Sequence, residues 1–134
     1  MKRILFFTVC FAGLVLTVCG QEAADYQKWM KTVAAASGSL RKNLDAKNGD
    51  AASADAKKLK EVFEQVHIFW NKKNVDDAMM SAMQASTAFG DLASQAAAGK
   101  FDDAAATLKK ATVTCGGCHA AHREKAADGS WKIK

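Results

Sequence analysis

Residues 51–71, AASADAKKLKEVFEQVHIFWN, hold the pattern that decides the fold of this chain of 134 residues. Large apolar residues recur there at spacings of three or four, and charged or small residues fill the positions between them. Because an α-helix has about 3.6 residues per turn, side chains at that spacing share one helical face. The apolar positions are Leu59, Val62, Phe63, Val66, Phe69 and Trp70. The stretch is therefore predicted to form an amphipathic helix whose apolar face lies in a core.

Three further stretches, residues 22–47, 75–98 and 102–127, show the same period. Polar or glycine-containing turns separate the four, at residues 48–50, 71–74 and 99–100. The chain has no proline and is rich in alanine and lysine, which favours helix throughout. No strand-like alternation is visible. Four helices of similar length joined by short turns predict an all-α fold, an antiparallel up-down-up-down four-helix bundle.

The motif Cys115-Gly116-Gly117-Cys118-His119 lies in the fourth stretch, with its cysteines and histidine on the apolar stripe. Two thiols about one helical turn apart can each add across a vinyl group of haem. The histidine that follows can supply the proximal nitrogen ligand of the iron. The motif therefore predicts one covalently attached haem of the c type, held by Cys115 and Cys118, with His119 as iron ligand.

Two other interpretations of the paired cysteines are less well supported. A redox disulfide of the thioredoxin type accompanies a βαβ pattern, which this sequence lacks. A zinc site needs two further ligands at suitable spacing, and His122 alone does not complete such a set.

The N-terminus predicts export. Lys2 and Arg3 precede an uncharged, mostly apolar stretch of fifteen residues, 4–18, as in a signal peptide. That stretch is shorter than the roughly 20 residues of a membrane-spanning helix. We expect cleavage after Gly20, which leaves residues 21–134 as one domain in the periplasm. The alternative is a lipoprotein anchored through Cys19, because residues 16–19 resemble a bacterial lipobox.

Export and charge limit the partners. Cys10 and Cys19 belong to the predicted signal peptide, so Cys115 and Cys118 are the only thiols of the mature chain. Loss of Lys2 and Arg3 lowers the formal charge from +5 to +3. Two haem propionates bring it near neutral, so the basic pI is no argument for an acidic partner. No cluster of aromatic and basic residues indicates nucleic-acid binding.

Met30 is the candidate for the opposite side of the iron. It lies eight positions into the first predicted helix, and His119 lies eight positions before the end of the fourth. If these helices are antiparallel neighbours, both residues lie about 12 Å along the bundle axis and point inward. Methionine and histidine are a known pair of axial ligands in electron-transfer haem proteins. A methionine on an apolar stripe can equally be core filler.

Taken together, the motif and the bundle resemble the cytochrome c prime family, itself an example of this topology. The resemblance covers nearly all the mature chain. Its specific parts are the segment from Cys115 to Arg123 and Tyr26-Gln27-Lys28-Trp29-Met30, which is similar to the family's Arg-Gln-x-x-Leu/Met/Phe. The resemblance implies that Arg123 lies near the proximal side of the haem, Gln27 near a propionate, and Met30 at the distal position.

The resemblance leaves two functions open. Tyr26 replaces the family's usual arginine, and His122 replaces an aromatic residue. Low-spin relatives use a methionine of the first helix as sixth ligand and transfer electrons, whereas high-spin members bind nitric oxide or carbon monoxide. We expect electron transfer with an unknown redox partner protein, and five-coordinate binding of a diatomic gas is the alternative. We expect no enzyme activity, since no nucleophile is paired with a base. A homodimer is an open possibility.

Overall fold

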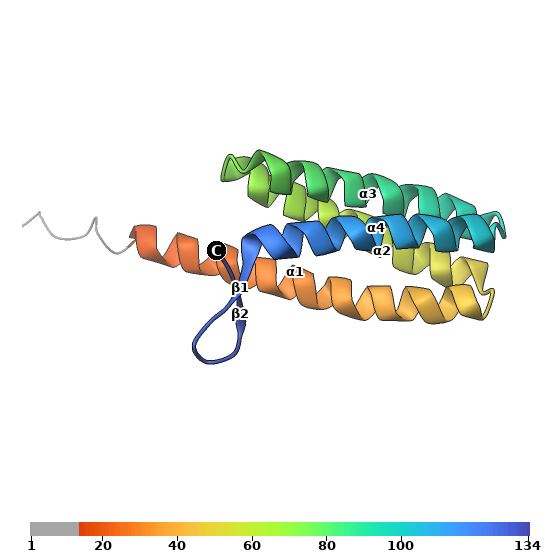
Figure 1. The fold of residues 1–134 in the computed structure, drawn as a ribbon, viewed down its shortest axis with the longest axis horizontal. Coiled ribbons are helices and arrows are strands. Elements are labelled where there is room, and N and C mark those ends of the chain that lie inside the picture. Colours follow the sequence, from red (N-terminus) through yellow and green to blue (C-terminus); the bar gives the residue numbers. More distant parts are fainter. Residues whose placement is uncertain (1–13) are drawn as a thin grey trace, which may run out of the picture.

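The computed structural model describes residues 14–134, with side chains from residue 22 onward. Most of the predicted signal peptide, including the side chain of Cys19, lies outside the described residues. Four helices follow one another: α1 (Leu14–Asp45), α2 (Gly49–Lys72), α3 (Asp76–Ala97) and α4 (Phe101–His122). Each packs on the next in the chain, in alternating directions (Figure 1). The predicted up-down four-helix bundle is thus confirmed.

The turns between helices use residues suited to them. The Asn48 side chain accepts a hydrogen bond from the backbone N–H of Ala51 at 3.2 Å and so caps α2. Gly99, after α3, has a φ of 71°, a left-handed conformation that glycine adopts without strain. Asn74, before α3, has a φ of 54° and makes no side-chain cap. These turns are short enough to keep sequential helices antiparallel.

The core runs the length of the bundle and is made of the predicted apolar stripes. Its fully buried large side chains are Leu40, Leu59 and Leu92. Phe63 and Phe89 stack in its centre with ring centroids 5.5 Å apart. In the fourth predicted stretch, Ala104 and Leu108 are buried, whereas the apolar residue Ala105 is exposed. The helical spacing of apolar residues therefore predicted which faces of the helices are buried, except at Ala105 in α4.

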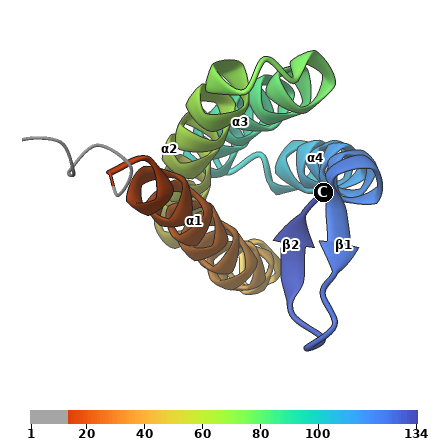
Figure 2. The same ribbon diagram turned by 90° about the vertical axis from the view of Figure 1, so that its left-hand side faces the viewer.

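The packing is uneven around the bundle. α2 and α3 are in contact along most of their length, whereas α1 and α4 touch at few points. The end view shows α1 beside α2 and α4 beside α3 (Figure 2). Away from the C-terminal end of α4, the seam between α1 and α4 holds an open hollow of about 450 Å³. Its walls include Leu44, Leu108 and Val113, whose side chain is 73% exposed.

The C-terminal residues form a β-hairpin that the sequence did not predict. The fourth helix was expected to continue to residue 127, but α4 ends at His122 because Arg123 adopts extended backbone angles. Strands β1 (Arg123–Lys125) and β2 (Trp131–Ile133) then pair antiparallel. The Arg123 guanidinium lies 3.9 Å from the centre of the Trp131 ring. This cation–π contact and the paired strands stabilise the hairpin against continuation of the helix.

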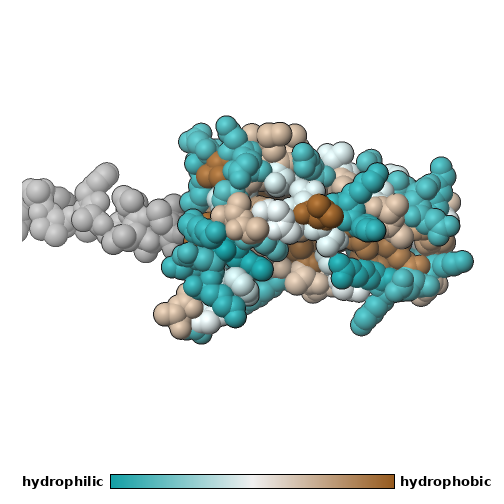
Figure 3. All heavy atoms as spheres, in the orientation of Figure 1, coloured by the Kyte–Doolittle hydropathy of each residue, from teal (hydrophilic) through white to brown (hydrophobic). Residues whose placement is uncertain are grey.

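The visible face of the molecule is mixed in character. Hydrophilic side chains dominate both of its ends, and apolar atoms show between them (Figure 3). Within residues 14–134, no helix is both long enough and apolar enough to cross a membrane.

Candidate functional site

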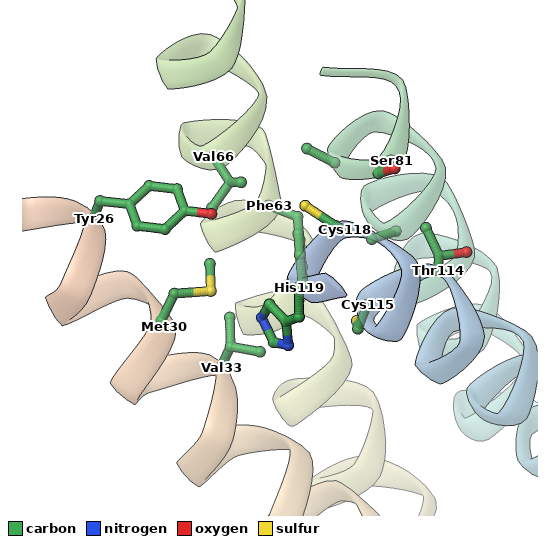
Figure 4. Close-up of a pocket in the computed structure, with 12 residues that line it drawn as sticks. Tyr26, Met30, Val33, Phe63, Val66, Ser81, Thr114, Cys115, Cys118 and His119 are labelled. Carbon is green, nitrogen blue, oxygen red and sulfur yellow. The ribbon is translucent and has the colours of Figure 1, made fainter. Parts of the chain in front are cut away.

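The motif faces a cavity enclosed by all four helices near the C-terminal end of α4. The cavity is small, with a volume of about 50 Å³. The close-up shows side chains of α1 and α2 on one side and those of α4 on the other (Figure 4). The lining residues are Tyr26, Met30, Val33, Phe63, Val66, Ser81, Ala82, Ala85, Thr114, Cys115, Cys118 and His119. Most of this wall is apolar.

Cys115 and Cys118 lie on the inner face of α4, one turn apart. Both are half-buried and pack against the core, while Gly116 and Gly117 between them are exposed. The two sulfurs are free and not joined in a disulfide. Burial raises the pKa of both thiols, so they stay protonated at neutral pH. The helix therefore presents two unbonded thiols to the same cavity.

His119 follows Cys118 and also lines the cavity. Burial lowers the pKa of its imidazole, and the positive charge of Arg123 lowers it further. The ring is therefore neutral at pH 7, and a neutral imidazole keeps a nitrogen lone pair for a metal. No hydrogen bond of His119 to another described side chain occupies that nitrogen.

Met30 lines the cavity from the wall opposite His119. The sequence placed the two residues at the same height along the bundle axis from predicted helix ends at residues 22 and 127. The observed ends of the two helices differ from these. α4 ends five residues earlier than expected, and α1 begins at Leu14 and projects beyond the other helices (Figure 1). The two differences do not alter the relative height of the residues. Figure 4 shows Met30 on α1 and His119 on α4, both directed into the cavity. The prediction that Met30 faces the motif thus agrees with the structure, and ligation of iron stays a prediction.

Tyr26 also lines the cavity, a position that the sequence did not predict. Its side chain is 8% exposed and packs on Phe69, with ring centroids 4.6 Å apart. The Trp70 indole N–H donates a hydrogen bond to the Tyr26 hydroxyl oxygen at 3.3 Å. Burial raises the pKa of Tyr26 to about 12, so the hydroxyl stays protonated. Tyr26 was visible on the apolar stripe of α1, but its contact with Trp70 joins residues 44 positions apart.

His122 is not among the residues that line the cavity. Its ring lies against Trp70, with centroids 5.1 Å apart. Its Nε2 atom is 2.7 Å from the Asp77 carboxylate at the start of α3. That hydrogen bond lowers the pKa of Asp77. His122 therefore ties the end of α4 to the α2–α3 end of the bundle.

Gln27 and Arg123, which the resemblance placed near the haem, lie beside the cavity and not in its wall. The Gln27 amide donates to the Trp131 carbonyl at 3.3 Å, which links α1 to the C-terminal hairpin. Arg123 lies on the hairpin and stacks on Trp131. Its charge still acts on His119.

The remaining methionines and histidines lie away from the cavity. Met80 and Met83 on α3 are 50% and 51% exposed. The ring of His67 is half-buried, with Nδ1 3.3 Å from the Met79 carbonyl. In the described part of the chain, no three His, Cys, Asp or Glu side chains cluster closely enough to hold a metal ion.

The residues around the cavity are compatible with a covalently attached haem. Two free thiols one helical turn apart, a neutral imidazole on the residue after the second thiol and a thioether on the facing wall line the same cavity. The apolar walls suit a large, mostly apolar ring. Comparisons of the chain with protein-family models, with curated proteins and with solved structures find no match.

Proposed function

We propose that this protein is an exported electron-transfer protein that carries one covalent haem of the c type. The observation that supports this most strongly is that Cys115, Cys118, His119 and Met30 all line one apolar cavity. Three of these residues come from one motif, but Met30 lies 85 positions before Cys115 in the chain. The motif alone would not place a thioether sulfur opposite the imidazole of His119.

Each residue has a defined part in the proposal. Cys115 and Cys118 would hold the haem through thioether bonds to its two vinyl groups. His119 and Met30 would supply an imidazole nitrogen and a thioether sulfur to its iron. When bound, the haem supplies a reversible one-electron couple. The apolar walls, with Val33, Phe63 and Val66 among them, exclude water and favour the less charged oxidation state.

The proposal includes the family and the location. The four-helix bundle, the motif near the end of α4 and Met30 on α1 support membership of the cytochrome c prime family. The signal-like N-terminus supports export to the periplasm, with anchoring through Cys19 as the alternative. The reaction partner would be another redox protein. Five-coordinate gas binding remains the competing function, and it differs in the part that Met30 plays.

The test is covalent haem staining after expression in a host that matures c-type haem proteins. The wild-type protein should keep haem on a denaturing gel, and a variant with Cys115→Ala and Cys118→Ala should lose it. Gly116→Ala is a matched control inside the motif, because a Cβ atom there meets nothing within 4 Å. The control should stain like the wild type. Stain that persists in the double variant would refute covalent attachment at this motif.

A further inference from the structure

Trp131 in strand β2 differs from the other aromatic side chains that the structure describes. It is 47% exposed, and no other described aromatic residue is among the exposed large apolar side chains. The hairpin that carries it projects from the bundle (Figure 1, Figure 2). An exposed indole ring leaves apolar area in water, and tryptophan is enriched among the residues that dominate protein–protein binding. The ring therefore marks a surface that a partner can cover with a gain in free energy.

Two cationic side chains share the face of the hairpin that carries Trp131. Lys125 lies opposite Trp131 in the antiparallel pairing, and Arg123 lies two residues before Lys125 on the same face. The Arg123 guanidinium is 3.9 Å and the Lys125 ammonium 5.3 Å from the centre of the indole ring. We call these three residues the basic aromatic face. Because both cations lie against the ring, the face is ordered before a partner arrives, which lowers the entropic cost of binding.

The carboxylates of the hairpin do not cancel this charge. Glu124 points to the opposite face, where it pairs with Lys132 at 3.1 Å. Asp128 lies in the hairpin turn, where a backbone N–H donates to its carboxylate at 2.9 Å. On α1, Gln27 contacts the hairpin, and the charged residue one turn after it is Lys31. The basic aromatic face is therefore locally positive, although the whole mature chain with its haem is expected to be near neutral.

The basic aromatic face is joined to both helices that carry the candidate iron ligands. The Gln27 amide on α1 donates to the Trp131 carbonyl at 3.3 Å, and Gln27 lies about one turn before Met30. On the other side, β1 begins at Arg123, four residues after His119 in α4. A partner bound to the hairpin therefore lies at the end of the bundle that holds the cavity.

We propose that the basic aromatic face binds an acidic electron-transfer protein. This inference rests on the proposed function, because only a redox partner needs to approach the cavity. The partner covers the Trp131 ring, and its carboxylates face Arg123 and Lys125. While it is bound, one electron passes from the reduced partner to the oxidised iron, and no bond or proton changes. Electron-transfer complexes bury little surface, which suits an area the size of this hairpin.

Flavodoxin, a small acidic electron-transfer protein, is the probe for the first test. NMR of the reduced, haem-bearing protein labelled with nitrogen-15 records one indole N–H signal from each of the three tryptophans. Oxidised flavodoxin should shift the signal of Trp131 most, and those of Trp29 and Trp70 little. Added salt should reverse the shift, because salt screens charges at an exposed surface. Lysozyme, which is a basic protein, should shift none of the three signals.

Two matched substitutions separate the basic aromatic face from the overall charge. Lys125→Gln and Lys132→Gln each remove one positive charge from the hairpin, but only Lys125 lies on the face of Trp131. Lys125→Gln should weaken flavodoxin binding about threefold, the usual effect of one exposed charge pair, and Lys132→Gln clearly less. Trp131→Ala should weaken binding about tenfold or more, because it removes the aromatic anchor. NMR titration gives all of these affinities.

Several outcomes would overturn the inference. They are an unmoved Trp131 signal in the wild-type protein, binding that salt does not weaken, and equal effects of the two lysine substitutions. Retention by vesicles of phosphatidylglycerol and phosphatidylcholine without binding of flavodoxin would overturn it too, and would assign the face to a membrane surface. A protein that carries no covalent haem overturns the proposed function as well. Haem staining before the titration separates these failures.

Discussion

Alanine in place of Gly49 should destabilise the protein, whereas alanine in place of Gly38 should stabilise it. Both glycines lie in helices, Gly49 at the first position of α2 and Gly38 within α1. A Cβ atom on Gly49 would lie 2.6 Å from the Ala96 carbonyl oxygen in α3. A Cβ atom on Gly38 would meet nothing within 4 Å. The two substitutions are therefore chemically identical and differ in the space around them.

The expected magnitudes follow from that difference. Ordinary contact starts at 3.4 Å, so the ends of α2 and α3 must separate by about 0.8 Å to admit the methyl group. The obstacle is backbone and cannot rotate away, and overpacking of this kind costs about 1–3 kcal/mol. Reduced freedom of the unfolded chain returns about 0.4–1 kcal/mol. We expect Gly49→Ala to lose about 1 kcal/mol of unfolding free energy and Gly38→Ala to gain about 0.5–1 kcal/mol.

Urea denaturation followed by helical circular dichroism measures both variants against the wild type. The melting temperatures should differ in the same direction, by roughly 4 °C for each kcal/mol in a domain of this size. Both glycines lie outside the cavity wall, so haem staining should not change. A Gly49→Ala protein as stable as Gly38→Ala would show that α2 and α3 do not approach this closely.

Three further changes test other parts of the molecule. Met30→Ala should lower the reduction potential and admit carbon monoxide, measured by optical spectra. A wild-type ferrous protein that is already high-spin and binds carbon monoxide would contradict ligation by Met30. Mass spectrometry of the exported protein should find Gln21 at its N-terminus, and a diacylglycerol group on Cys19 would place the protein on a membrane surface instead. Asp77→Asn should reduce stability at pH 7, because the hydrogen bond with His122 lowers the pKa of Asp77 in the folded state. That contribution is lost as the pH falls below the ordinary carboxyl pKa of about 4, so urea curves of variant and wild type should converge near there.

The fold could be predicted because its main determinant is local. Leu59, Phe63 and Val66 were assigned to the core from their helical spacing, and all three are buried. The C-terminal hairpin escaped prediction because each of its strands has three residues, too few to show alternation. Its stability comes from contacts such as that of Arg123 with Trp131. Such contacts leave no periodic pattern in the sequence.

In the candidate site, too, some residues could be predicted from a short segment of sequence, and others depend on how the helices pack. Cys115, Cys118 and His119 follow from the spacing that haem attachment needs, which is a property of one short segment. Met30 required the bundle topology as well, and its face and level agree with the structure. The hydrogen bond of Tyr26 with Trp70 could not be predicted, because it depends on how the Trp70 side chain from α2 is oriented.

The sparse contact between α1 and α4 has a consequence for how a large, rigid group reaches the cavity. α1 carries Met30 and α4 carries the motif, yet these two helices are joined mainly through the rest of the bundle and the bond of Gln27 to Trp131. Separating them breaks few contacts and leaves the extensive α2–α3 interface intact. Local opening follows the least stable contacts of a protein. We therefore expect this seam to be the entrance through which haem approaches the two thiols, and hydrogen exchange of the haem-free protein should be fastest in α1 and α4.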